Sequence, residues 1–379
     1  MRITFATLLI VHGLIHLLGF VKAWRFATVP QLTGATIVTV PPSLERVVGL
    51  LWLLACVALL VAAALLLARS SGFWIVAAVG VITSQALVTL AWPDAKFGTV
   101  ANALLLLPII IASADVRFQR ESDEVARALL ASAPADPGAA VTSAELARLP
   151  EPVRRWLTSA GVVGKPRPRL VRLTQAGLLR TAPDQAYMPA TAQQYFQTDA
   201  MAFVWRVRVT MARALPIAGR DSFVDGRGRM IIKLGSLVPL ADAADARVDQ
   251  GALLRYLGEL VWFPAAALDP RIRWEATGED TARATLTHGE VTGVAEFRFA
   301  DDGRFLELTA DRYMGSGPEA RLERWRIPAS EWRRYSGVVV PSRGDVIWEL
   351  AAGDFSYYRW ELTSLEYDRA ELLPAAPLW

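Results

Sequence analysis

Two of the three histidines in this 379-residue chain lie four positions apart in an apolar segment, as His12 and His16. A spacing of four places both imidazole rings on one face of a helix. Such rings can ligate haem or a metal ion, relay a proton or contact a quinone, or they can stay neutral and bond to neighbouring helices. Gln85 and Asn102 lie in later apolar segments and could be partners. These four residues form a predicted polar site inside the membrane.

The sequence contains little else that could build a metal site or a catalytic site. Cys56 is the only cysteine, and no other histidine or cysteine is well placed to complete a ligand set around the histidine pair. Gly-x-Ser-x-Gly, Walker and His-Glu-x-x-His motifs are absent, and His288 stands beside a turn glycine. We therefore predict no catalytic residue, no metal site and no cofactor, and the pattern favours a protein that is not an enzyme.

Four apolar segments in the first 114 residues must position the histidine pair. They cover residues 3–20, 47–68, 73–92 and 97–113. Each is close to the roughly 20 apolar residues that cross a bilayer. Hydrophobic residues make up 53% of the chain, which is too many for an ordinary soluble protein and fits a membrane part joined to a soluble part. We expect a multi-pass membrane protein with the lipid bilayer as its first partner.

The charges are distributed unevenly along the chain. Residues 1–114 contain six Lys or Arg and only two acidic residues, which leaves the remainder nearly neutral. A nearly neutral soluble part argues against binding of nucleic acid. Four of the six basic residues fall on the side of the loop over residues 21–46, and two fall on the other side. The positive-inside rule then favours a cytoplasmic first loop and an extracytoplasmic C-terminal domain.

The composition changes after residue 114. Residues 115–141 are predicted to form an amphipathic helix and then a linker of alanine and proline. Further on, apolar residues alternate with polar ones, as in Trp205, Val207 and Val209, and turn pairs such as Asp225-Gly226 and Arg343-Gly344 recur. This pattern predicts an antiparallel meander of nine to eleven strands, with one inserted helix over residues 251–261.

The expected architecture is a four-helix transmembrane domain over residues 1–114, the helix and linker over 115–141, and an α+β soluble domain over 142–379. A curved antiparallel sheet, or half-barrel, with a helix in its concave side can contain an apolar ligand. The aromatic residues predicted to line such a site are Trp205, Tyr256, Trp262, Phe263 and Trp348. They could equally fill a large core, because aromatic stripes at strand spacing are usually packing.

Several motifs within residues 145–370 resemble a bacterial family of unknown function. They are Leu149-Pro150-Glu151-Pro152-Val153-Arg154-Arg155-Trp156-Leu157, Gln194-Tyr195-Phe196, Arg255-Tyr256-Leu257 with Val261-Trp262-Phe263-Pro264, and Tyr358-Arg359-Trp360-Glu361-Leu362. Members often carry membrane spans before this domain, with a pattern similar to His12-Gly13-x-x-His16. At the level of fold, the strands and inserted helix resemble the LolA/LolB lipoprotein-carrier half-barrel. That resemblance implies acyl-chain binding on a concave face, by fold analogy alone.

These observations predict a protein anchored in the bacterial cytoplasmic (inner) membrane, whose β-rich domain binds a lipid or another apolar small molecule without catalysis. The alternative is a membrane redox protein, or one dependent on a metal or haem, with His12 and His16 as ligands. A scaffold with no ligand is a third interpretation, which a tightly filled concave face would support.

Overall fold

The computed structural model describes residues 2–30, 32–136, 138–211 and 215–374. Contacts within the chain define two compact units, one over residues 1–119 and one over residues 120–374. The last five residues of the predicted soluble domain, 375–379, lie outside the described residues.

The first unit is helical. Its long helices are α1 (Arg2–Ala23), α2 (Pro42–Leu67), α3 (Phe73–Leu90) and the first part of α5 (Gly98–Ala131), and the single turn α4 (Trp92–Ala95) joins α3 to α5. The four long helices are apolar enough and long enough to cross a membrane, as the sequence predicted. At most 39% of the most apolar stretch of each helix is buried. Apolar side chains such as Leu14 and Ile82 therefore point outward, which suits contact with lipid.

Helix α5 continues well past the predicted end of the fourth span. It runs unbroken through Pro108 to Ala131, so the predicted amphipathic helix is the second part of α5. Residues 120–131 belong to the second unit. There Ala126, Leu129 and Leu130 pack against Tyr195 and Val204 of the sheet.

The second unit is a 13-stranded antiparallel sheet within the described residues. Its first six strands, here called the first wing, are β1 (Leu170–Leu179), β2 (Met188–Gln197), β3 (Ala202–Met211), β4 (Leu215–Val224), β5 (Arg227–Leu234) and β6 (Val238–Ala243). The second wing is β7 (Ile272–Ala276), β8 (Thr281–His288), β9 (Val291–Phe299), β10 (Phe305–Met314), β11 (Arg321–Tyr335), β12 (Val338–Leu350) and β13 (Gly353–Tyr367).

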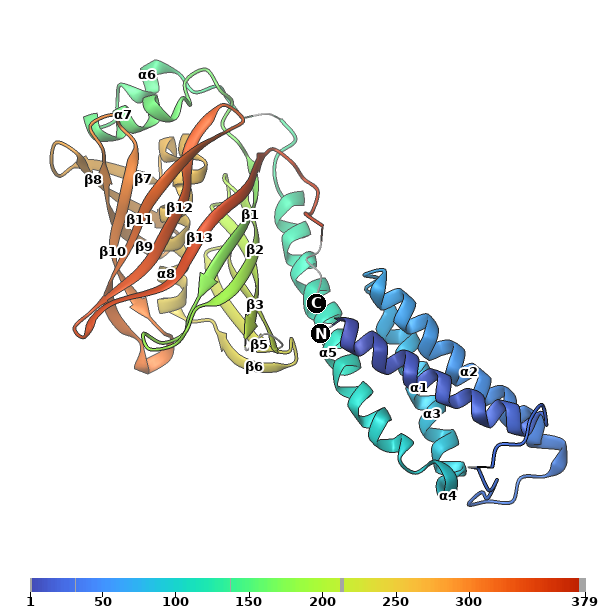
Figure 1. The fold of residues 1–379 in the computed structure, drawn as a ribbon. Helices are drawn as coiled ribbons and strands as arrows, with labels where there is room; N and C mark the ends of the chain where they lie inside the picture. The colour runs from blue at the N-terminus through green and yellow to red at the C-terminus, as the bar shows by residue number, and fades with distance from the viewer. Residues whose placement is uncertain (1, 31, 137, 212–214, 375–379) are drawn as a thin grey trace. The chain divides into compact units, whose positions relative to one another are not determined.

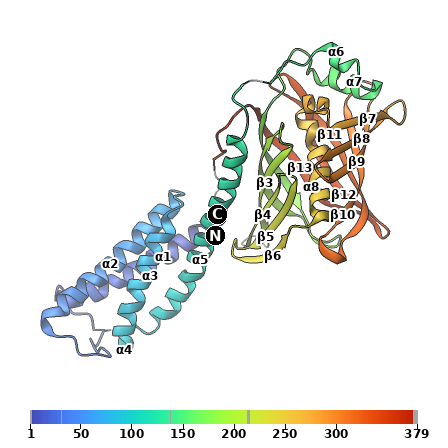
Figure 2. The same cartoon turned by 180° about the vertical axis from the view of Figure 1, so that it is seen from behind.

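Each wing is a meander in which every strand pairs with its neighbour in sequence. The wings are joined by one pairing between strands distant in sequence, β1 with β13, in which Val171 lies opposite Tyr367. The edge strands of the sheet are therefore β6 and β7, which are consecutive in the chain. The sheet is curled into a half-barrel (Figures 1 and 2), as the sequence predicted.

Helix α8 (Ala246–Glu259) connects the two edge strands and lies in the curl of the sheet (Figure 2). Asp245 begins the helix, because its carboxylate accepts hydrogen bonds from the backbone N–H groups of Arg247 and Val248 at 2.8 and 3.0 Å. Two short 3₁₀ turns, η1 (Leu260–Trp262) and η2 (Pro264–Leu268), lead from α8 to β7. Another, η3 (Gly317–Glu319), lies between β10 and β11. The inserted helix was predicted five residues too late, at residue 251.

Helices α6 (Ser143–Leu146) and α7 (Glu151–Ala160) cover one end of the half-barrel (Figure 1). Helix α7 buries Trp156 against Trp274 and Phe297, with ring centroids 6.3 and 6.1 Å apart, and ends at Gly161 in a left-handed conformation. This aromatic packing closes that end of the sheet.

Two details of the predicted meander were wrong. The sheet has more strands than the nine to eleven expected. The pair Arg343-Gly344 is not a turn and lies inside β12. A Cβ at Gly344 would lie 2.4 Å from the indole of Trp360 and 2.5 Å from the carbonyl of Pro328. Glycine is needed here for close approach between strands, a requirement that a local sequence pattern does not distinguish from a turn.

Candidate functional site

A cavity of about 800 Å³ lies inside the second unit, between α8 and the concave face of the sheet. Both wings and the helix contribute to its wall. The large apolar side chains on the wall include Trp205, Ile217, Ile327, Val346, Trp348 and Phe355. The concave face therefore keeps a mainly apolar space that its own side chains do not fill.

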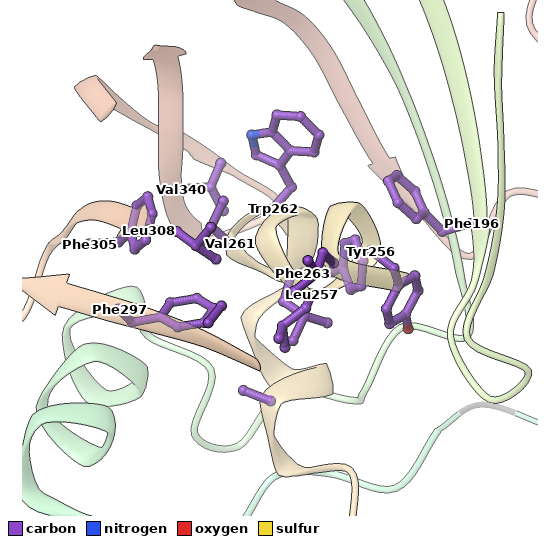
Figure 3. Close-up of a cluster of buried hydrophobic side chains, with 14 of the residues drawn as sticks. Phe196, Tyr256, Leu257, Val261, Trp262, Phe263, Phe297, Phe305, Leu308 and Val340 are labelled. Carbon is purple, nitrogen blue, oxygen red and sulfur yellow. The ribbon is translucent and has the colours of Figure 1, made fainter. Parts of the chain in front are cut away.

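Three of the five aromatic residues predicted to bind a ligand line this cavity: Trp205, Trp262 and Trp348. Tyr256 and Phe263 instead pack in the core with Phe196, with ring centroids 4.8 to 6.3 Å apart (Figure 3). The Tyr256 hydroxyl donates to the carbonyl of Thr198 at 3.3 Å, and burial raises the pKa of that hydroxyl.

Two tryptophans on the wall, Trp205 and Trp262, have their indole N–H groups bonded within the protein. Trp205 Nε1 donates to Gln175 Oε1 at 3.2 Å, and Trp262 Nε1 donates to the carbonyl of Pro341 at 3.2 Å. Trp348 stacks on Tyr357 with ring centroids 6.0 Å apart. The indole N–H groups of Trp205 and Trp262 are thus fixed by the fold, and the rings offer apolar surface.

Helix α8 turns its polar stripe toward the cavity and its apolar stripe toward the core. Gly251, Arg255 and Glu259, spaced by four, line the cavity. Leu253, Leu257 and Leu260 are fully buried in the core. The helix therefore contributes charged groups to a wall whose large side chains on the sheet are mostly apolar.

A buried charged cluster occupies the middle of this helical wall. Arg255 donates from Nε to Glu259 Oε1 at 2.9 Å and from Nη1 to Asp221 Oδ2 at 2.7 Å. Its guanidinium lies over the Trp205 ring, 4.4 Å from the centroid. Gln194 Nε2 completes the cluster by donating to Glu259 Oε2 at 2.6 Å.

The protonation of the cluster follows from its burial. Burial opposes a charge on Arg255, yet the carboxylates of Glu259 and Asp221 hold the pKa of Arg255 above its ordinary value. Burial raises the pKa of the Glu259 carboxyl, against the opposing effect of Arg255 and Gln194. The cluster thus pairs one guanidinium with two carboxyl groups, and burial makes the Glu259 carboxyl easier to protonate than an exposed glutamate.

The sequence reasoning did not identify Arg255 or Glu259 as part of the site. Aromatic type alone selected Tyr256 and Phe263 from the same segment. One signal in the sequence could have separated the two faces of this helix. Gly251, Arg255 and Glu259 are spaced by four residues, and residues at i and i+4 share one helical face.

In the first unit, the structure brings together all four residues of the predicted polar site, with Ser84 as a fifth member. His12 Nε2 lies 2.8 Å from Asn102 Oδ1 and 3.2 Å from Ser84 Oγ. His16 Nε2 lies 2.8 Å from the same hydroxyl. Gln85 Oε1 accepts from Asn102 Nδ2 at 3.0 Å. Helices α1, α3 and α5 are therefore linked by side-chain hydrogen bonds.

One backbone contact fixes the direction of this network. The carbonyl of His12 can only accept, so His16 Nδ1 donates to it at 2.7 Å. In the neutral ring, His16 Nε2 can then only accept, and the one Ser84 hydroxyl proton is shared between this nitrogen at 2.8 Å and Asn102 Oδ1 at 2.9 Å. The described residues of the chain contain no group of three or more His, Cys, Asp or Glu side chains that could hold a metal ion.

The chain thus combines four helices suited to a membrane with a curled antiparallel sheet that encloses an apolar cavity. It belongs to the family of unknown function DUF6544, which matches residues 139–360. The sequence resemblance to a family of unknown function is confirmed.

Comparison with solved structures found several similar chains, among them the following three. A LolA superfamily protein from Nitrosomonas europaea is 13% identical, with a TM-score of 0.34 over 62% of this chain and 96% of that one. An outer membrane lipoprotein-sorting protein domain from Vibrio parahaemolyticus is 7% identical, with a TM-score of 0.32 over 52% and 85%. A DUF1329 family protein from Desulfovibrio piger is 10% identical, with a TM-score of 0.32 over 60% and 93%. A search of curated proteins gave no match.

Proposed function

We propose that this chain is a membrane-anchored, non-enzymatic protein of the bacterial cell envelope whose β-rich domain binds a lipid or another apolar ligand. The observation that carries this proposal is the apolar cavity of about 800 Å³ between α8 and the sheet. Sites for organic ligands typically have volumes of about 300–1,000 Å³. Each Å² of apolar ligand surface removed from water would contribute roughly 25 cal/mol to binding.

The charged groups of the cavity support binding rather than catalysis. The carboxylates of Asp221 and Glu259 both bond to Arg255, at 2.7 and 2.9 Å. A general base needs a carboxylate that is free to accept a proton from a substrate. The ionic contacts of this cluster are instead typical of a structural network that holds a helix against a sheet.

The membrane helices suggest where in the cell the protein acts. In our proposal they anchor the protein in the cytoplasmic membrane, and the β-rich domain lies outside the cytoplasm. An apolar ligand has very low solubility in water, so a binding domain tethered to a bilayer remains close to its source.

The alternative function, a redox or metal-dependent membrane protein, would use His12 and His16 as ligands. Both Nε2 atoms lie within hydrogen-bonding distance of Ser84, so a metal would have to replace these contacts. Visible absorption and elemental analysis of the purified chain test this alternative. Haem absorption, or bound metal, that is lost in the His12→Ala variant would favour it over the lipid proposal.

Photolabelling of the full chain in phosphatidylcholine nanodiscs tests the proposed function. The probe is a long-chain fatty acid with a mid-chain diazirine, and labelled peptides are mapped by mass spectrometry. We expect labels on peptides that line the cavity. Ala241 lines the cavity from the edge strand β6, and Ala241→Trp should lower that labelling by about tenfold, or about 1.4 kcal/mol.

The matched control is Val294→Trp, which adds the same ring to an exposed position on β9. This variant should be labelled like the wild type. The proposal is wrong if cavity peptides stay unlabelled while peptides of the membrane helices react, or if both tryptophan variants behave identically.

A further inference from the structure

We propose that the ligand of this cavity is an anionic amphiphile, whose apolar chain fills the cavity and whose negatively charged headgroup binds to Arg312. The inference rests on the proposed function and names its ligand class. It starts from an imbalance of charge. The described residues that line the cavity include five arginines, and two of them, Arg180 and Arg312, have no ion pair with a described residue.

The two carboxylates on the wall do not pair with either of these arginines. Asp221 and Glu259 are both engaged by Arg255, at 2.7 and 2.9 Å. Arg312 and Arg180 line the same cavity, and neither has an ion pair with any described residue. Arg180 donates to the carbonyls of Ser356 and Pro183, each at 2.7 Å. These carbonyls satisfy N–H groups, but they do not neutralise a charge.

Arg312 is held in place by contacts that leave its charge unbalanced. Its Nε donates to the carbonyl of Gly251 on α8 at 3.1 Å. Its guanidinium lies over two rings of the cavity wall, 4.7 Å from the centroid of Trp325 and 5.6 Å from that of Trp348. The ring contacts fix the plane of the guanidinium. Its Nη groups make no hydrogen bond to a described residue and remain for a ligand.

Gly251 in α8 leaves room for the guanidinium of Arg312. A Cβ at Gly251 would lie 3.1 Å from Arg312 Nε and 3.3 Å from Nη2. Glycine inside a helix costs about 1 kcal/mol relative to alanine. At this position it lets the guanidinium approach the helix backbone.

A planar guanidinium matches the geometry of a carboxylate or a phosphate, because two of its N–H groups can bond to two oxygens together. Arg312 belongs to a wall that also carries Trp325, Trp348 and Phe355. A molecule that satisfies both requirements has an apolar chain and one anionic group. The anion could be the carboxylate of a free fatty acid or the phosphate of an acidic lipid.

Photolabelling with two matched probes tests the inference. The full chain in phosphatidylcholine nanodiscs is treated with the diazirine fatty acid or with the alcohol of the same chain. Labelling of cavity peptides is divided by labelling of the membrane helices in the same sample, which corrects for partition into the bilayer. We expect the acid to be preferred over the alcohol by roughly tenfold, as a charge-assisted hydrogen bond would give.

Arg312→Gln should remove this preference while labelling by the alcohol persists, and Arg312→Lys should keep part of it. The matched control is Arg324→Gln, which removes an exposed arginine that pairs with Asp311 at 3.7 Å and does not line the cavity. Each variant is first compared with the wild type by thermal melting.

The two lipid sources are separated by displacement. If phosphatidylglycerol in the nanodiscs displaces the acid probe from the cavity, the anion is a lipid phosphate. If only unlabelled oleate displaces it, the anion is a free carboxylate, and both results support the inference. Equal labelling by acid and alcohol in the wild type, or a preference that survives Arg312→Gln, overturns the inference and leaves the proposed function intact. Absence of cavity labelling by either probe overturns the proposed function itself.

Discussion

At the scale of single residues, Asp245 shows how one side chain joins the cavity helix to the second wing. Its Oδ1 accepts from the first turn of α8, at Arg247 and Val248, and its Oδ2 accepts from the backbone N–H of Gly317 at 2.7 Å. The hydrogen bonds from Gly317, Val248 and Arg247 hold the pKa of Asp245 below its ordinary value. The carboxylate therefore stabilises the fold most when it is ionised.

We predict that Asp245→Ala destabilises the second unit by about 1–2 kcal/mol near neutral pH, as expected for loss of a helix N-cap. Because the pKa of Asp245 is lowered in the folded state, its stabilisation is present above the unfolded value of about 4 and is lost as the pH falls through the folded value. The difference in melting temperature between wild type and variant should shrink on acidification below about pH 4.

The measurement is intrinsic tryptophan fluorescence during heating of the full chain in detergent, from pH 7 to pH 3. Asp184→Ala, in an exposed segment between β1 and β2, is the control and should melt like the wild type. A difference between Asp245→Ala and wild type that stays constant with pH would contradict the ionic part of the explanation.

Residue type and spacing in the sequence predicted only part of the candidate site. The alternation around Trp205 placed its ring on the concave face, and the spacing of His12 and His16 placed both rings on one helical face. The charged wall at Arg255 was not predicted. It depends on Asp221 and Gln194, which come from two strands that only the folded sheet brings near α8.

At the scale of elements, α8 fits into the half-barrel because glycines face it from the strands. A Cβ at Gly228 on β5 would lie 2.6 Å from the backbone oxygen of Val248 in the helix. A Cβ at Gly293 on β9 would lie 3.0 Å from the side chain of Leu254. Both wings therefore approach the helix closely at positions that lack a side chain.

We predict that Gly228→Ala destabilises the second unit by about 1–3 kcal/mol, because the added methyl group would meet backbone atoms that cannot move without shifting the helix. The matched substitution is Gly258→Ala on α8 itself, where the nearest side-chain atoms would be 3.4 Å away. This second variant should be neutral or more stable by up to about 1 kcal/mol, because alanine favours the helix.

Thermal melting of the two variants in the same detergent is the measurement. Equal melting temperatures for Gly228→Ala and wild type would show that β5 and α8 are farther apart than the distances above require.

The elements themselves were largely predictable. Apolar length identified the four membrane helices, and alternation identified an antiparallel meander with an inserted helix. The number of strands was not predicted, because some turns between strands lack a pair of residues that contains glycine. One such turn joins β2 to β3 and uses Met201 with a positive φ of 52°. The pairing of β1 with β13 was also beyond sequence reasoning, because no local pattern specifies a contact across the whole domain.

At the scale of the whole molecule, the membrane orientation remains a prediction from the distribution of charge. Within the first unit, Asp94 accepts hydrogen bonds from Thr33 Oγ1 and from the Gly34 backbone N–H, both at 2.7 Å. The loop over residues 21–46 and the connection between α3 and α5 therefore lie at the same end of the helices. This end carries most of the basic residues and is predicted to face the cytoplasm.

Cysteine labelling tests the orientation, because Cys56 is the only native cysteine. In a Cys56→Ser background, we expect Glu290→Cys, in the exposed turn between β8 and β9, to react with a membrane-impermeant maleimide in cells whose outer membrane is permeabilised. Ala35→Cys, in the first loop, should react only after lysis. The opposite pattern would place the β-rich domain in the cytoplasm.

The order of strands also sets the time at which the cavity can exist. Among the described residues, eleven of the twelve strand pairings join consecutive strands and can form locally while the chain is being synthesised. The pairing of β1 with β13 must wait until the ribosome has released Tyr367, almost two hundred residues after Val171. Until then β1 is an open edge, and the half of the wall that carries Arg312 and Trp348 is not yet joined to the half that carries Trp205. Filling of the cavity is therefore a late event, which follows the synthesis of β13.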